Sequence, residues 1–119
     1  MSARNHVFLI VSGIVFCSLF SAACVSTTIG EVAYSGGGLS LSVSHTGEPS
    51  EGYVQVTVYE IKNNQQEERT TLYAPLNLQQ GANTAFINGT LEPGQYKLYI
   101  YLIQNGERKT AAIRDIVVN

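Results

Sequence analysis

Apolar residues recur at every second position near the C-terminus, and this alternation constrains the fold more than any other feature. Pro93 and Gly94 signal a turn, and the strand-like segment after it places four residues on one face: Tyr96, Leu98, Ile100 and Leu102. The same period of two recurs in residues 39–45 and 53–61, and no segment has a helical period. The sequence therefore predicts an all-β domain of half-buried strands.

Turn signals separate these strands at intervals of about ten residues. Asn105-Gly106 is the strongest of them and predicts a two-residue hairpin of type I′. The glycines at 36–38 predict a flexible hinge or a bulge, and residues 62–68 predict a polar connection. Six or seven strands at this spacing are typical of an antiparallel β-sandwich.

Weaker segments complete the predicted set of strands. Residues 30–34 are the candidate first edge strand, and residues 83–88 form another strand. A short strand at 69–73 is expected to end before Pro75, because proline cannot donate a ladder hydrogen bond. The segment after it, at 76–81, is interpreted as an edge segment that runs into a turn.

The last predicted strand covers residues 109–118. Its apolar residues change phase between Ile113 and Ile116. Such a change is typical of an extra residue in a strand, so we expect a bulge at Arg114-Asp115.

Residues 91–96, with the sequence Leu-Glu-Pro-Gly-Gln-Tyr, lead into the alternating strand near the C-terminus. A turn followed by a strand whose first inward residue is tyrosine resembles the corner before strand F of immunoglobulin-like and fibronectin type III sandwiches. The resemblance covers residues 39–118 as a strand pattern and implies an antiparallel immunoglobulin-like β-sandwich. It implies a buried Tyr96 ring and a hydroxyl bonded to nearby backbone, in a structural corner formed by Leu91, Pro93, Gly94 and Tyr96.

The N-terminus has the organisation of a signal peptide. Arg4 and His6 precede an apolar run at 7–20, which is short for a bilayer span, and small residues at 21–23 then precede Cys24. Two alternatives to lipoprotein processing stay open at this point. Ordinary signal peptidase could cleave before Cys24 and release the chain, or the segment could remain as an uncleaved anchor.

The Ser-Ala-Ala-Cys sequence that ends at Cys24 resembles a bacterial lipobox, although Ser21 stands where lipoproteins usually carry leucine. The resemblance implies that Cys24 becomes the lipidated first residue, for example with palmitate, and anchors the protein in the membrane. Because Cys17 would be removed, Cys24 would be the only mature cysteine, and lipidation would protect its thiol in an oxidising compartment. Val25, rather than aspartate, follows, so the resemblance favours the outer membrane over the inner.

The 119 residues accordingly divide into three predicted parts. Residues 1–23 form a signal peptide of lipoprotein type. Residues 24–38 carry the lipidated cysteine, a tether and the candidate first edge strand. Residues 39–119 form the immunoglobulin-like sandwich.

Residues with catalytic or metal-binding chemistry are few. The predicted mature chain has one histidine, His45, and one aspartate, Asp115, without a Gly-x-Ser-x-Gly sequence. The acids at 48–51 and 67–68 are expected in solvated loops, not as a carboxylate pair across a pocket. The formal net charge of −2 provides no attraction for nucleic acid. We therefore expect no enzymatic activity, no metal site and no cofactor.

Four tyrosines point away from the predicted core: Tyr53 and Tyr59 on one strand, and Tyr99 and Tyr101 on another. These strands are neighbours in an immunoglobulin-like topology, so the rings are expected to form one candidate binding surface. Two alternatives stay open. Tyrosine is common in strands for reasons of packing alone, and the first segment could cover the rings.

The sequence thus predicts a small lipoprotein of the bacterial cell envelope that acts through protein binding or self-assembly, without catalysis. The protein is also expected to attach to the membrane through a lipid on Cys24. One alternative is a secreted or periplasmic accessory or chaperone protein of a surface-fibre or secretion assembly, since the size and strand order resemble the curli-assembly chaperone group. Another is a small secreted protease inhibitor that presents the loop at 46–52.

Overall fold

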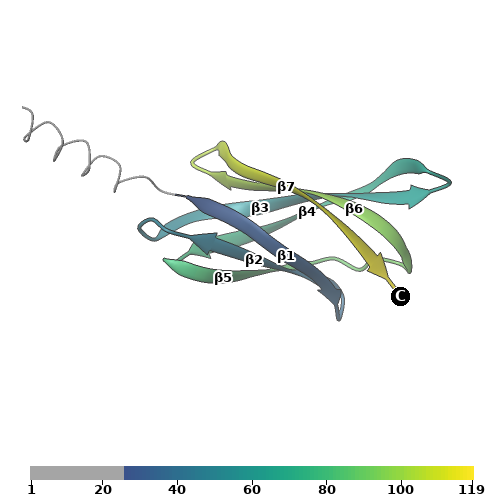
Figure 1. Ribbon diagram of the computed structural model, residues 1–119, viewed down its shortest axis with the longest axis horizontal. Coiled ribbons are helices and arrows are strands. Elements are labelled where there is room, and N and C mark those ends of the chain that lie inside the picture. Colours follow the sequence, from purple (N-terminus) through teal and green to yellow (C-terminus); the bar gives the residue numbers. More distant parts are fainter. Residues whose placement is uncertain (1–25) are drawn as a thin grey trace, which may run out of the picture.

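The computed structural model describes residues 26–119. These residues form seven strands in two antiparallel sheets, which confirms the predicted all-β, immunoglobulin-like sandwich (Figure 1). The first sheet has the order β1-β2-β5 and the second the order β4-β3-β6-β7. The strands are β1 (Thr27–Ser35), β2 (Gly38–His45), β3 (Ser50–Lys62), β4 (Gln65–Leu78), β5 (Gly81–Asn88), β6 (Gly94–Gln104) and β7 (Glu107–Val118). The predicted signal peptide and Cys24 lie outside the described residues.

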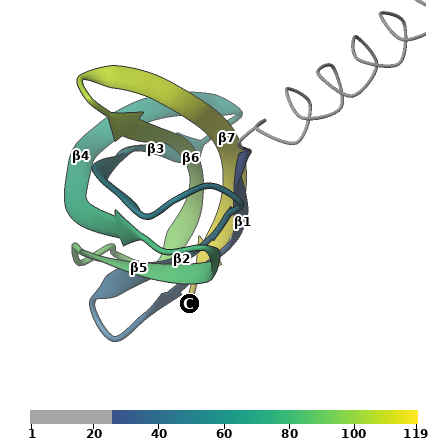
Figure 2. The same ribbon diagram turned by 90° about the vertical axis from the view of Figure 1, so that its left-hand side faces the viewer.

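The core lies between the two sheets and is built from the residues that alternate in the sequence. Figure 2 shows the strands arranged around this common interior. The inner rows of the three central strands are almost fully buried, at 3% exposure or less, as the alternation predicted: Leu39, Leu41, Val43, Val54, Val56, Val58, Tyr96, Leu98, Ile100 and Leu102. The β1 strand, predicted as an edge, pairs with β2 and adds the buried side chain of Ile29.

The connection predicted at residues 62–68 is mostly strand. Only Asn63 and Asn64 form the turn, with φ of 52° and 63°, a left-handed conformation that asparagine tolerates better than most residues. The β4 strand begins at Gln65 and continues through Pro75, so the predicted short strand at 69–73 was too short. Residues 65–68 are exposed, and their sequence therefore has no apolar alternation. Pro75 is accommodated because β4 lies at the edge of its sheet.

The glycine run forms a tight turn instead of the predicted hinge or bulge. Gly36 and Gly37 are the two residues of the β1–β2 turn, both with positive φ. Gly38 already belongs to β2, where a β-carbon would stand 2.5 Å from Cζ of Phe86. A glycine is needed there because the aromatic ring of the neighbouring β5 strand lies over its backbone.

The bulge predicted at Arg114-Asp115 is absent, because β6 and β7 pair in regular register from Gly94↔Val118 to Leu102↔Thr110. The extra residue of β7 is Lys109. The apolar residues change phase because both faces of β7 carry them. Val118 is buried, whereas Ile113 and Val117 point outward and are 54% and 64% exposed.

Three of the four sheet edges carry a bulge. The extra residue is Arg69 in β4 and Lys109 in β7, and the irregularity in β1 lies between Ile29 and Val32. Arg114 covers the β1 bulge by donating hydrogen bonds to the backbone oxygens of Ile29 at 2.8 Å and Gly30 at 3.1 Å. Bulges and charges at an edge discourage another strand from pairing with it.

Candidate functional site

The four tyrosines predicted as a binding surface lie on the outer face of the β4-β3-β6-β7 sheet. Tyr99 pairs with Thr57 and Tyr101 with Gln55, so the two tyrosine rows are adjacent. The rings of Tyr59 and Tyr99 meet edge to face, with centroids 5.1 Å apart and an interplanar angle of 76°. Tyr53 is 41% exposed, and the other three are half-buried by their neighbours. The β1 strand does not cover them, since it belongs to the other sheet.

Sequence reasoning missed two members of this surface. Tyr73 of β4 is 62% exposed, and its ring centroid lies 6.3 Å from that of Tyr53. Ile113 of β7 lies opposite Tyr99. Tyr73 could have been found from its alternation with Ala74 and Leu76, and Ile113 from a strand with two apolar faces. We call this surface the tyrosine face, composed of Tyr53, Tyr59, Tyr73, Tyr99, Tyr101 and Ile113.

A shallow apolar cleft of about 520 Å³ opens within the tyrosine face, lined by Tyr99, Tyr101, Ala111, Ala112 and Ile113. The guanidinium of Arg108 lies 4.2 Å from the centre of the Tyr101 ring, and the Tyr99 hydroxyl donates to Gln66 at 3.3 Å. Each contact restrains one of the two rings that line the cleft. An apolar lining with polar groups at its rim suits an apolar side chain of a partner.

The predicted corner lies at one end of the sandwich. Tyr96 is 3% exposed, and its hydroxyl donates a 2.6 Å hydrogen bond to the backbone oxygen of Glu92, which is the geometry of a tyrosine corner. Leu91 is buried, and its N–H donates to the Tyr34 hydroxyl at 3.0 Å. Pro93 is exposed and Gly94 half-buried. The corner therefore joins β6 to β1 across the two sheets.

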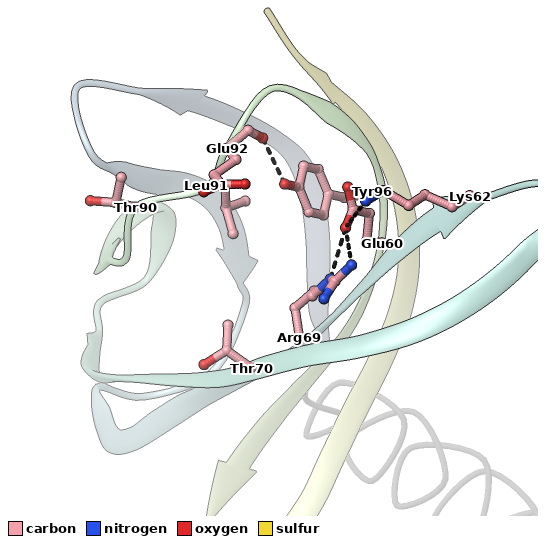
Figure 3. A pocket seen from close by; sticks show the side chains of 8 residues that line it. All are labelled: Glu60, Lys62, Arg69, Thr70, Thr90, Leu91, Glu92 and Tyr96. Atoms are coloured by element: carbon pink, nitrogen blue, oxygen red, sulfur yellow. Dashed lines mark hydrogen bonds and ion pairs between the residues drawn. The ribbon is translucent and has the colours of Figure 1, made fainter.

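A charged cleft of about 460 Å³ lies beside this corner (Figure 3). Glu60 continues the inner row of β3 and is only 9% exposed. Arg69, the bulged residue of β4, donates to Glu60 Oε1 from Nε at 2.8 Å and also pairs with Glu67 at 2.8 Å. The hydrogen bond to Glu60 raises the pKa of the Arg69 guanidinium. The bulge thus directs the Arg69 guanidinium toward the Glu60 carboxylate. Without this partner, the buried charge of Glu60 would destabilise the fold.

Sequence reasoning did not identify this pair. The available signal was a glutamate at the fourth position of an inward row otherwise made of valines, Val54, Val56 and Val58. The cleft is lined by two acids and two bases together with threonine, leucine and tyrosine side chains: Glu60, Lys62, Arg69, Thr70, Thr90, Leu91, Glu92 and Tyr96. Its formal charges balance, and three of its four charged side chains already interact, because Glu60 pairs with Arg69 and also with Lys62 at 3.7 Å. We interpret it as a structural network.

His45 is a buried structural residue. It is 4% exposed, its Nδ1 lies 2.9 Å from the Thr27 hydroxyl and its Nε2 lies 2.8 Å from the Glu48 backbone oxygen. Neither partner is a serine. The loop predicted at 46–52 is only four residues long, because β3 begins at Ser50. Within residues 26–119, no group of three or more His, Cys, Asp and Glu side chains could hold a metal ion.

The burial of Tyr96 predicts a loss of stability at alkaline pH. Removal from water raises the pKa of Tyr96, and the charges of Glu60 and Glu92 raise it further. The folded pKa of Tyr96 lies above the unfolded value of about 10. The contribution of the protonated phenol to stability is therefore complete below that pH and is lost as the pH rises through the folded pKa. Urea unfolding across the alkaline range should therefore show a smaller pH-dependent loss for Tyr96→Phe than for the wild type. Equal losses would contradict this assignment.

Residues 26–119 contain no helix with the length and apolarity that crossing a membrane requires. The comparison with protein-family models found no match, and the comparison with curated proteins found none either.

Proposed function

We propose that this chain is a small lipoprotein of the bacterial cell envelope that binds a protein through its tyrosine face and performs no catalysis. The observation that carries the proposal is a cluster of tyrosine and aliphatic side chains on the outer face of three adjacent strands, β3, β6 and β7, where they stand among polar residues such as Gln55 and Thr57. Solvent-facing rows of a stable sandwich are usually polar. A cluster of exposed aromatic and aliphatic side chains on such a face is therefore better explained by a partner than by the needs of the fold.

The face of the β4-β3-β6-β7 sheet is a better candidate than the two edges of the same sheet. Bulges at Arg69 and Lys109 interrupt the outer ladders of β4 and β7, which disfavours strand addition. Tyrosine supplies a large contact area at little cost in side-chain entropy, and the apolar cleft between Tyr99 and Tyr101 provides a pocket for an anchoring side chain. The docking part of the proposal predicts that replacing these two tyrosines removes the partner.

Two other functions are alternatives to a membrane-anchored binding protein. A free periplasmic accessory or chaperone protein could use the same tyrosine face, and it would differ by lacking a lipid at Cys24. The protease-inhibitor alternative is less favoured, because the loop at 46–49 is short and its Glu48 oxygen is bonded to His45. The attachment at Cys24 therefore separates the leading proposal from its strongest rival.

Cys24→Ser is expected to move the protein from the membrane fraction to the soluble fraction and to abolish labelling with a palmitate analogue. The motive is the apolar run that ends in Ser-Ala-Ala-Cys. Cys17→Ser is the matched control, since that cysteine lies in the segment expected to be removed, and it should leave labelling unchanged. Fractionation and labelling of the two variants decide the point. Labelling that persists in Cys24→Ser would end the lipoprotein proposal.

A further inference from the structure

We propose that the end of the sandwich that carries the β2–β3 and β6–β7 turns rests against the bilayer, with the tyrosine face standing beside it. This inference rests on the proposed lipid attachment at Cys24. It adds an interaction surface, the phospholipid headgroups of the anchoring membrane, and it places the partner of the tyrosine face at the level of that membrane.

The first observation is that Ser26, where the described chain begins, is hydrogen-bonded to Thr46 in the β2–β3 turn. The Ser26 N–H donates to the Thr46 hydroxyl at 2.9 Å, and the Ser26 oxygen accepts from the Thr46 N–H at 3.0 Å and from its hydroxyl at 3.1 Å. Val25 alone separates Ser26 from Cys24. Two residue steps of extended chain reach at most about 7 Å. A lipid on Cys24 would therefore hold Thr46 close to the headgroups.

The second observation is that this end of the domain forms one connected unit. His45 bonds to Thr27 and to the oxygen of Glu48, which ties the β2–β3 turn to the start of β1. Gln104, at the base of the β6–β7 hairpin, donates to the Ser50 hydroxyl at the start of β3. Figure 1 shows both turns at the end where β1 begins. The tether therefore positions both turns and not β1 alone.

The charges at this end do not favour a particular lipid. Three acids, Glu48, Glu51 and Glu107, accompany two bases, Arg108 and Lys109. Lys109 pairs with Glu107 at 3.2 Å, and Arg108 lies over Tyr101. The contact with the bilayer follows from the length of the tether, so it should be insensitive to salt and to the fraction of anionic lipid.

The tyrosine face then extends away from the membrane along β3. The turns Gly36–Gly37 and Asn63–Asn64 lie at the far end (Figure 1). Tyr53 is near the anchored end of β3, and Tyr59 is six residues farther along the strand, which corresponds to about 20 Å. A partner that covers this face must lie within a few nanometres of the bilayer. That requirement favours a membrane-embedded or membrane-anchored protein over one that is freely diffusing.

Two single-cysteine variants of the lipidated protein test the orientation. Glu107→Cys and Gln65→Cys are matched, because each residue is exposed and is the first strand residue after a two-residue turn, at opposite ends of the domain. Each variant is labelled with an environment-sensitive fluorophore, while the thiol of Cys24 is blocked by its lipid. The proteins are reconstituted into phosphatidylcholine vesicles that contain a headgroup-attached quencher. We expect severalfold stronger quenching at position 107 than at position 65, unchanged by salt.

The outcomes separate the orientation from the anchor. Equal quenching at the two positions, in protein that floats with the vesicles, would overturn the orientation and leave the anchor intact. Quenching at position 107 that vanishes in high salt would also overturn it, since electrostatic attraction would then be the cause. A protein that carries no lipid and does not float with the vesicles would overturn the proposed attachment and the orientation together.

Discussion

Replacing Tyr96 with alanine is expected to lower the free energy of unfolding by about 3 to 5 kcal/mol, the range for large buried aromatic residues. The ring is 3% exposed and packs in the core, and its hydroxyl closes the corner by donating to Glu92 at 2.6 Å. The substitution would leave a cavity beside the Glu60–Arg69 pair. Because a domain of this size is stable by only about 5 to 10 kcal/mol, the variant should melt far below the wild type or fail to fold.

Two variants separate the parts of this effect. Tyr96→Phe keeps the ring and removes one hydrogen bond, which should cost about 1 kcal/mol. Tyr73→Ala is the control for loss of an aromatic residue from a strand, and because Tyr73 is 62% exposed it should change stability by only about 0.5 kcal/mol. Thermal and denaturant unfolding of the three variants measure the differences. An unchanged melting temperature in Tyr96→Ala would mean that this ring is not part of the core.

Replacing both Tyr99 and Tyr101 with serine is expected to abolish partner binding while the domain remains folded. The two rings form the walls of the apolar cleft, and interface aromatics often contribute about 2 kcal/mol or more each. The cost in stability should be moderate. The edge-to-face contact of Tyr99 with Tyr59 is worth about 0.5 to 1.5 kcal/mol, and the cation–π contact of Arg108 with Tyr101 is worth about 0.5 to 1 kcal/mol where it is exposed.

Phe86→Ser is the matched control for this double variant. Phe86 is also a half-exposed aromatic residue on an outer sheet face, but it belongs to the β1-β2-β5 sheet. Capture of envelope proteins by the isolated domain, together with sedimentation of the domain alone, compares all three proteins. Loss of the same partner, or of self-association, in the double variant but not in Phe86→Ser supports docking on the tyrosine face. A folded double variant that still recovers every partner would contradict it.

Much of the fold could be predicted because one side of each central strand is apolar. The rows that start at Leu39, Val54 and Tyr96 are buried as predicted, and Asn105-Gly106 forms the predicted turn, with φ of 52° and 75°. The same reasoning was wrong where a strand has two similar faces. The start of β4, where both faces are exposed, was mistaken for a connection. In β7, where both faces carry apolar residues, the alternation pattern predicted a bulge at the wrong place.

The candidate site divides in the same way. Tyr53, Tyr59, Tyr99 and Tyr101 were predicted from their positions opposite the buried rows, because a period of two assigns each residue of a regular strand to one face. That the two rows are adjacent depends on the pairing of β3 with β6. Tyr73 and Ile113 join the face because β4 and β7 flank the β3–β6 pair. Which strands pair with one another is not a local property of the chain.

By itself, the sequence determined which residues face the core, where several of the turns occur, and that a tyrosine closes the corner before β6. These features depend on neighbouring residues, through backbone sterics and the burial of apolar side chains. Only the tertiary structure decided that Arg69 reaches Glu60, that Arg114 covers the β1 bulge, and that Ser26 is tied to Thr46. Each of these contacts joins polar groups from different strands, and a hydrogen bond has a steep dependence on distance and angle. Their geometry is therefore set by register and bulges, which no periodic pattern of residues reveals.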